Sequence, residues 1–185
     1  MNSGTALGLL GMYSACASVG VIATVALRTG LSAPTGPAKT IASCVPVTFV
    51  MAACVALFYA FAFNQSSTAW TEHARLKSEA KKAGEKPPKF NEVKYGTLST
   101  KLHNANRTLG NFWEQLVPFL VSLLGYALFV DANRAAVLGW AWLFFRSYYP
   151  FLFALPFPGV LASTVPAYWC VWWMVGATVL AAARL

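Results

Sequence analysis

Long apolar runs alternate with shorter polar segments along this chain of 185 residues. A helix crosses a bilayer with about 20 consecutive apolar residues. Five runs meet that length, and they predict an all-α integral membrane helical bundle with five transmembrane helices. The runs are residues 5–27, 41–63, 106–130, 135 to about 155, and 160–183.

The first run is rich in Gly, Ala and Ser and contains no charged residue. Small residues of this kind suit close helix contact in lipid. A cleaved signal peptide is the alternative interpretation, but no Lys or Arg precedes the run, so we favour a retained helix. A Gly- and Pro-containing stretch, 29–40, follows it. We therefore divide the chain into 1–40, an N-terminal transmembrane helix and loop, and 41–185, a four-helix membrane domain with a polar loop at 64–105.

Within the polar loop, residues 66–83 have the pattern of a helix that lies on the membrane surface and stops at Gly84, before Pro87 and Pro88. Residues 89–99 are expected to be irregular. Tight turns are predicted at 131–134 and at 156–159, where Asp, Asn, Pro and Gly gather.

Composition and charge agree with a membrane protein. Hydrophobic residues make up 57% of the chain and charged residues 11%, whereas soluble domains carry about 25% charged residues. The net charge is +8, and eight of the fourteen Lys and Arg lie in 64–105. Placed beside membrane spans, they favour a cytoplasmic loop in contact with membrane lipids rather than nucleic acid binding. The four cysteines lie in apolar runs without metal-ligand spacing, so we predict no metal site.

The third run carries unexpected polar chemistry. Arg107, Asn111 and Glu114 are spaced i, i+4 and i+7, which places them on one helical face, and Pro118 follows. A carboxylate inside a span needs a partner. At 1.5 Å per residue, Glu114 and Arg146 lie at similar depths, about 10 and 13 Å from the same membrane surface. Either a structural ion pair or a polar pocket for an anionic or zwitterionic ligand fits this spacing.

These residues resemble the signature of the MAPEG family, the membrane-associated proteins in eicosanoid and glutathione metabolism. The similar features are Arg107, Asn111, Glu114 and Pro118 at their spacing, followed by Phe-Leu, and Arg146 with Tyr149 on the next predicted helix. The resemblance covers about 41–183, the four-helix unit of the family. Residues 5–27 would then be an added helix.

The resemblance implies a homotrimer with glutathione bound between subunits. By position, Arg107, Asn111 and Glu114 resemble residues that hold the tripeptide, with Arg146 and Tyr149 beside them. Glutathione carries two carboxylates and an ammonium group, and buried charges need partners. Glu114 would take the ammonium group and Arg107 a carboxylate.

Three departures bear on catalysis. Leu109 stands where the family's enzymes usually have His or Gln, Phe153 replaces a second tyrosine, and no Lys or Arg lies between Arg146 and Arg184. A thiol keeps a high pKa in an apolar site without a nearby cation. Arg146 and Tyr149 are the remaining catalytic candidates.

Two functions stay open for the chain. One is a glutathione transferase or peroxidase that acts on a lipophilic substrate. The other is a non-catalytic accessory subunit among neighbouring subunits of a membrane complex. For either, we expect an integral membrane protein of the endoplasmic reticulum or another organelle.

Overall fold

The computed structural model describes residues 41–96 and 98–184, and every regular element in that part of the chain is helical. The predicted first span, 5–27, lies outside the described residues. The elements are a short 3-10 helix η1 (Ile41–Cys44) and helices α2 (Val45–Ala83), α3 (Phe90–Tyr95), α4 (Thr100–Phe129), α5 (Ala132–Ser147), α6 (Tyr149–Phe153) and α7 (Leu161–Ala182).

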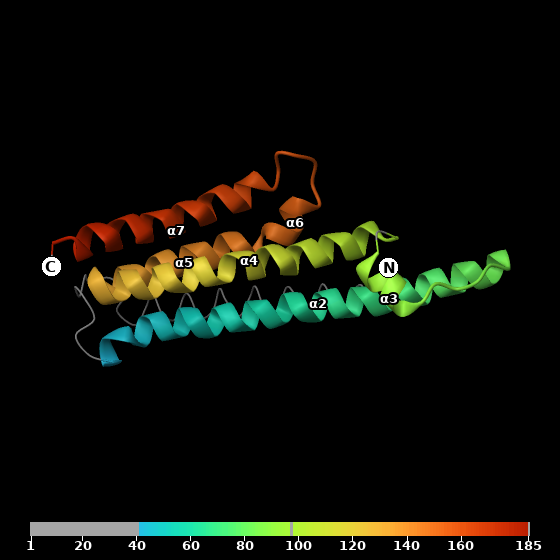
Figure 1. The fold of residues 1–185 in the computed structure, drawn as a ribbon, viewed down its shortest axis with the longest axis horizontal. Coiled ribbons are helices and arrows are strands. Elements are labelled where there is room, and N and C mark those ends of the chain that lie inside the picture. Colours follow the sequence, from blue (N-terminus) through green and yellow to red (C-terminus); the bar gives the residue numbers. More distant parts are fainter. Residues whose placement is uncertain (1–40, 97, 185) are drawn as a thin grey trace.

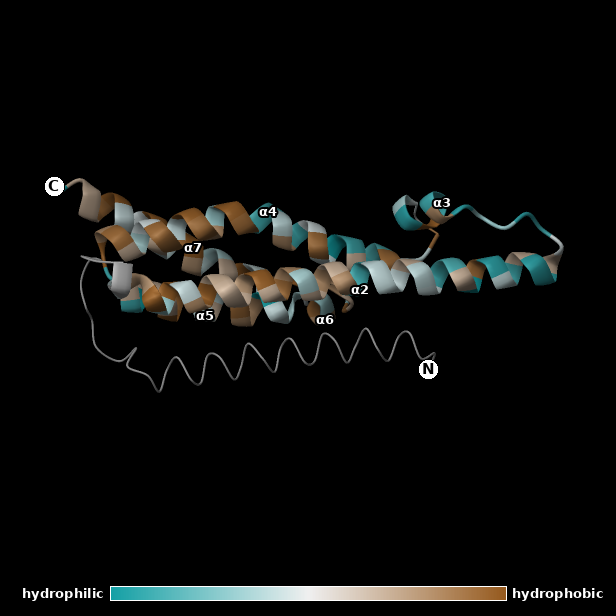
Figure 2. Ribbon diagram, turned by 90° about the horizontal axis from the view of Figure 1, so that it is seen from below, coloured by the Kyte–Doolittle hydropathy of each residue, from teal (hydrophilic) through white to brown (hydrophobic). Residues whose placement is uncertain are grey.

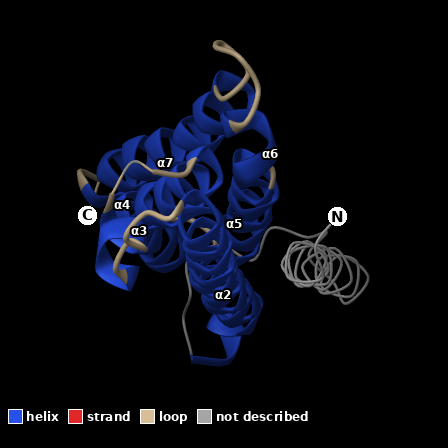
Figure 3. Cartoon of the chain, turned by 90° about the vertical axis from the view of Figure 1, so that its right-hand side faces the viewer, coloured by secondary structure: helices blue, strands red, loops and turns tan. Residues whose placement is uncertain are grey.

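Helices α2, α4, α5 and α7 pack side by side with alternating directions (Figures 1 and 3). Their shared core is aromatic and aliphatic. Phe119 of α4 stacks on Trp142 of α5 with ring centroids 3.8 Å apart. Leu57 of α2 and Met174 of α7 are also fully buried. The resulting helical bundle confirms the predicted architecture.

Three described helices, α2, α4 and α7, are long and apolar enough to cross a membrane. The predicted fourth span at 135–155 is not one helix, because α5 ends at Ser147 and α6 starts at Tyr149. Pro150 lies at the start of α6, where it supplies no backbone donor to the preceding turn. α5 alone has 16 residues, so the predicted count of five spans is not confirmed.

The polar segment differs most from expectation. The prediction of a separate helix at 66–83 on the membrane surface is wrong, because α2 runs unbroken for 39 residues. No Gly or Pro interrupts it between Pro46 and its C-cap, Gly84, whose φ of 69° is left-handed. The hydrophilic end of α2 therefore extends past the other bundle helices (Figures 1 and 2).

The polar segment also has a core of its own. Residues 89–99 are not wholly irregular, because Phe90–Tyr95 form α3. The backbone N–H of Lys89 donates to the Glu92 carboxylate at 2.9 Å, which caps this helix. Val93 of α3 packs with Ala69 of α2 and Leu102 of α4, all buried. The C-terminal end of α2 is thus held to α3 and α4 by a small hydrophobic cluster outside the main bundle.

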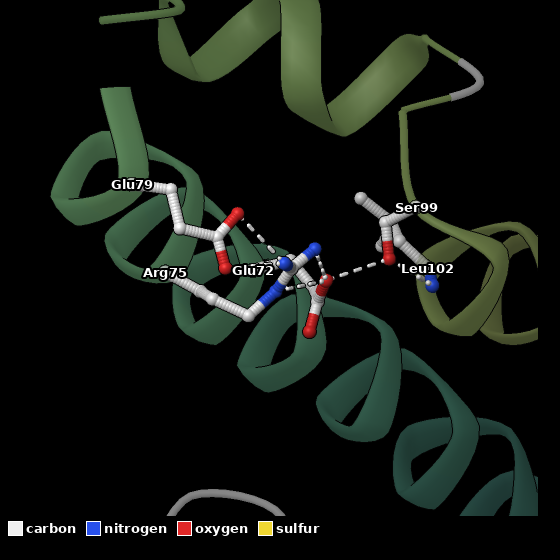
Figure 4. Close-up of polar contacts among 5 residues, drawn as sticks. All are labelled: Glu72, Arg75, Glu79, Ser99 and Leu102. Carbon is white, nitrogen blue, oxygen red and sulfur yellow. Dashed lines mark hydrogen bonds and ion pairs between the residues drawn. The ribbon is translucent and has the colours of Figure 1, made fainter. Parts of the chain in front are cut away.

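A buried carboxylate fastens this region (Figure 4). Glu72 is 4% exposed, and its Oε2 accepts from Ser99 Oγ at 2.8 Å and from Arg75 Nη2 at 2.9 Å. Ser99 also caps α4, because its Oγ accepts from the Leu102 N–H. Burial alone would raise the pKa of Glu72, but the hydrogen bonds from Arg75 and Ser99 outweigh it, and the net pKa is lowered.

A lowered pKa makes this attachment pH-dependent. The stabilisation by ionised Glu72 is complete above the ordinary carboxyl pKa of about 4.3 and is lost as the pH falls below it, through the lowered pKa of the folded protein. We predict that Glu72→Gln lowers hydrogen-exchange protection of the α2–α4 contact at pH 7 by about tenfold or more, since hydrogen bonds to charged groups contribute about 1.5–3 kcal/mol. In the Glu72→Gln variant, hydrogen-exchange protection should also lose most of its pH dependence between pH 6 and pH 3, once the pH dependence of the intrinsic exchange rates is corrected for.

Glu79→Gln is the matched control, because Glu79 pairs with the same Arg75 but its side chain is 56% exposed. In the Glu79→Gln variant, hydrogen-exchange protection of the α2–α4 contact should keep the pH dependence of the unmodified protein. Equal profiles for the two variants would show that Glu72 does not fasten the segment.

Side chains of α2 and α4 pack directly against Gly139 of α5. A Cβ there would lie 2.6 Å from Cγ1 of Val50 and 3.0 Å from Cδ1 of Leu123. Both neighbours are fully buried, and branched Val50 has little freedom to move. A side chain at position 139 would therefore push α5 away from the bundle.

We predict that Gly139→Ala destabilises the protein by about 1–3 kcal/mol, the usual cost of overpacking a core. Gly176→Ala on α7 is the control, because a Cβ there meets nothing within 4 Å. It should be neutral or stabilising, since Ala is the better helix former. Thermal unfolding in detergent measures the stability of both variants. Equal stability would show that Gly139 is not closely packed against α2 and α4.

Candidate functional site

The three polar residues predicted to share a face of one span lie on consecutive turns of α4, but they divide between its buried and open sides. Asn111 is buried, at 9% exposed. The Arg107 and Glu114 side chains are 45% and 56% exposed, and they form an ion pair of 3.7 Å along the helix. Val117 and Val121 continue the same exposed side of α4. One charged pair thus lies on an otherwise apolar surface.

Arg146 occupies the last turn of α5 and is 1% exposed. Its Nη1 donates to Oδ1 of Asn111 at 2.7 Å. Its Nε and Nη2 are also buried, and neither has a hydrogen-bond partner among the described residues, 41–96 and 98–184. Nε and Nη2 form one edge of the planar guanidinium, which matches the two oxygens of a carboxylate.

The direct Glu114–Arg146 pair allowed by the depth comparison is not formed. Among the described residues, Glu114 pairs with Arg107, and Arg146 bonds to Asn111. Asn111, and not Glu114, is the residue of α4 that turns toward Arg146 of α5. The rotation of α4 about its own axis turns the Glu114 side chain away from Arg146. A comparison of positions along the helices does not contain this rotation.

Tyr149 opens α6 and is 4% exposed. Its ring stacks on Phe153 at 5.5 Å. Its phenol interacts electrostatically with Arg107, Arg146 and Glu114. The structure therefore gathers all five predicted site residues into one cluster, although they come from three helices.

Sequence reasoning missed two members of this cluster. The rings of Trp142 and Tyr168 each lie 5.5 Å from Cζ of Arg146, a distance typical of cation–π contacts. Trp142 is four residues before Arg146 on α5, so helical spacing could have found it. Tyr168 belongs to α7, and nothing in the sequence linked it to the site.

The chain can now be compared with known proteins. The MAPEG family model matches residues 47–181, from the first turn of α2 to the end of α7. The chain belongs to the MAPEG family. The match covers the whole four-helix bundle and confirms the resemblance seen in the sequence. No curated protein and no solved structure matches the chain significantly.

For this MAPEG protein, the cluster can hold a carboxylate at the free edge of Arg146 and an ammonium group at Glu114. A metal ion is a different matter, because no group of three or more His, Cys, Asp or Glu in the described part of the chain could ligate one.

The Arg146–Asn111 bond yields a stability prediction. Asn111→Leu removes the amide oxygen that accepts from the buried Arg146 guanidinium at 2.7 Å, so we expect a loss of about 1.5–3 kcal/mol. Adding Arg146→Met should recover most of it, because a buried polar pair can be replaced by apolar side chains of similar volume. Unfolding of the single and double variants in detergent measures the coupling.

Gln115→Leu, one turn further along α4 and half-buried, is the control and should change stability little. Additive losses in the double variant would show that Asn111 and Arg146 do not depend on each other.

Proposed function

We propose that this MAPEG protein binds glutathione at the cluster of Arg107, Asn111, Glu114, Arg146 and Tyr149. The observation that carries the proposal is the buried guanidinium of Arg146, whose Nε and Nη2 have no hydrogen-bond partner. A buried charge with unsatisfied donors is costly. A ligand carboxylate at this edge would relieve that cost.

The charges of the cluster match the tripeptide. Arg107 and Arg146 supply two cations for its two carboxylates, and Glu114 supplies the anion for its ammonium group. Asn111 holds Arg146 in place through the 2.7 Å bond. MAPEG proteins commonly use glutathione, which agrees with this distribution of charge.

The open side of the site supports a position between subunits. The Arg107–Glu114 pair is about half exposed on one chain, and charges in a span face protein or water rather than lipid. A second copy packed against α4 would cover the pair. MAPEG proteins are typically membrane trimers, so we propose that a homotrimer completes the site.

Chemistry beyond binding requires the glutathione thiol to ionise, because the thiolate is the nucleophile. Glutathione supplies the thiol for transfer to, or reduction of, a lipophilic substrate. Of the two catalytic candidates, Tyr149 is the one we propose for stabilising a thiolate, because the three nitrogens of Arg146 are already assigned to Asn111 and to a ligand carboxylate. The second candidate function, a non-catalytic accessory subunit, is favoured by one observation: no Lys or Arg lies between Arg146 and Arg184.

Binding is tested with the full chain in nanodiscs and radiolabelled glutathione in equilibrium dialysis. Arg107→Ala and Glu114→Ala should each weaken binding at least tenfold, since each removes a charge proposed to contact the ligand and hydrogen bonds to charged groups contribute about 1.5–3 kcal/mol. Arg134→Ala removes the same charge from the exposed far end of α5 and should leave affinity unchanged.

Unchanged affinity in Arg107→Ala and Glu114→Ala, or no binding to the unmodified protein, would overturn the proposal. A conjugation assay with an electrophilic aryl halide then separates the two functions. Turnover that is lost in Arg146→Met supports a transferase, and binding without turnover supports an accessory subunit.

A further inference from the structure

The end of α2 beyond the membrane carries charges that the proposed glutathione site does not use. We define the arm as residues 64–83 of α2, which begin next to the Gln65–Asn106 hydrogen bond between α2 and α4. At 1.5 Å per residue the arm is about 30 Å long. It continues the direction of the span, past the ends of the other bundle helices (Figure 1).

Acidic residues of this chain do not neutralise the lysines of the arm. The chain has only six acidic residues. Glu72 and Glu79 both pair with Arg75, Glu92 caps α3, Glu114 pairs with Arg107, and Asp131 caps α5. Among the described residues, no ion pair includes a lysine.

Two of these lysines share a helical face with an exposed aromatic ring. Trp70, Lys77 and Lys81 are spaced i, i+7 and i+11, so each lysine lies within about 20° of Trp70 around the helix and the three span about 40°. All three are exposed, and Trp70 is 64% exposed. The opposite face, with Ala69 and Glu72, is buried against α3 and α4. We call this exposed row the Trp70–Lys81 face.

The protein's own membrane does not satisfy these lysines. Lys77 and Lys81 lie about 20 and 26 Å beyond Asn64 along the helix, whereas charge interactions are screened over about 8 Å at physiological salt. A second copy of this chain is equally unsuited, because five of its six acidic residues are already engaged. Nucleic acid recognition favours Arg, and this face has only Lys.

We propose that the Trp70–Lys81 face docks an acidic amphipathic helix of a partner protein. The partner lies along α2, with an apolar side chain against Trp70 near the membrane and carboxylates opposite Lys77 and Lys81 further out. Trp is typical of the residues that contribute most to binding at protein interfaces. A tilted contact with Phe90, with ring centroids 4.5 Å apart and 30° between the ring planes, holds the Trp70 ring in position.

The test uses the full chain in phosphatidylcholine nanodiscs and a fluorescein-labelled 18-residue peptide with Leu on one helical face and Glu on the other. Fluorescence anisotropy should show saturable binding that empty nanodiscs lack and that weakens as NaCl rises from 50 to 300 mM. Lys77→Gln/Lys81→Gln should weaken binding at least tenfold, and Trp70→Ala should weaken it about tenfold.

Lys86→Gln/Lys89→Gln removes the same charge from the exposed connection between α2 and α3 and should change affinity less than twofold. Circular dichroism checks that each variant keeps its helix content. Equal loss in the two double variants would overturn the proposal, and so would equal binding of a peptide with Gln in place of Glu. Preferential binding of the arm to phosphatidylserine vesicles or to RNA would overturn it as well.

Discussion

A guanidinium buried among four helices must find hydrogen-bond acceptors inside the protein, and the Arg146–Asn111 bond is where this structure begins to meet that demand. The bond joins the end of α5 to the middle of α4 at 2.7 Å. The rings of Trp142 and Tyr168 add contacts from two helices. Nε and Nη2 of Arg146 nevertheless have no hydrogen-bond partner in the described part of the chain. The bundle therefore holds a cation in place with one edge of it unpaired, and this is the edge proposed for a ligand carboxylate.

The division of α4 into two sides gives the rest of the site its form. Asn111 faces the bundle, and the half-exposed Arg107–Glu114 pair faces outward. Water would solvate such a pair, but hydrocarbon does not, so within a membrane the pair must face water or protein rather than lipid. The proposed glutathione site between subunits accounts for a cluster that is half closed by its own chain and half open at a charged pair.

Helix α2 connects two environments with different stabilising forces. Its first half contributes Leu57 and Phe61 to the apolar core of the bundle. Its second half is held to α3 and α4 by a small cluster and by the Glu72 carboxylate, whose acceptor capacity is shared by Ser99 and Arg75. Since no break interrupts the helix, its charged end projects at a defined direction and distance from the membrane.

The sequence by itself predicted the helical bundle and the family, because apolar run length and i, i+4, i+7 spacing are local properties of a helix. It also singled out five residues that the structure brings together, and their role in binding stays a prediction. It did not predict the unbroken α2, since the polar composition after Phe63 resembles a surface helix, and it gave no sign that contacts such as Glu72–Ser99 hold this end of α2 beside α4. Nor did it pair Arg146 with Asn111 rather than with Glu114, or bring Tyr168 to the guanidinium. Those outcomes depend on how each helix is rotated about its axis, and that rotation is decided by side chains packing across helices far apart in the chain.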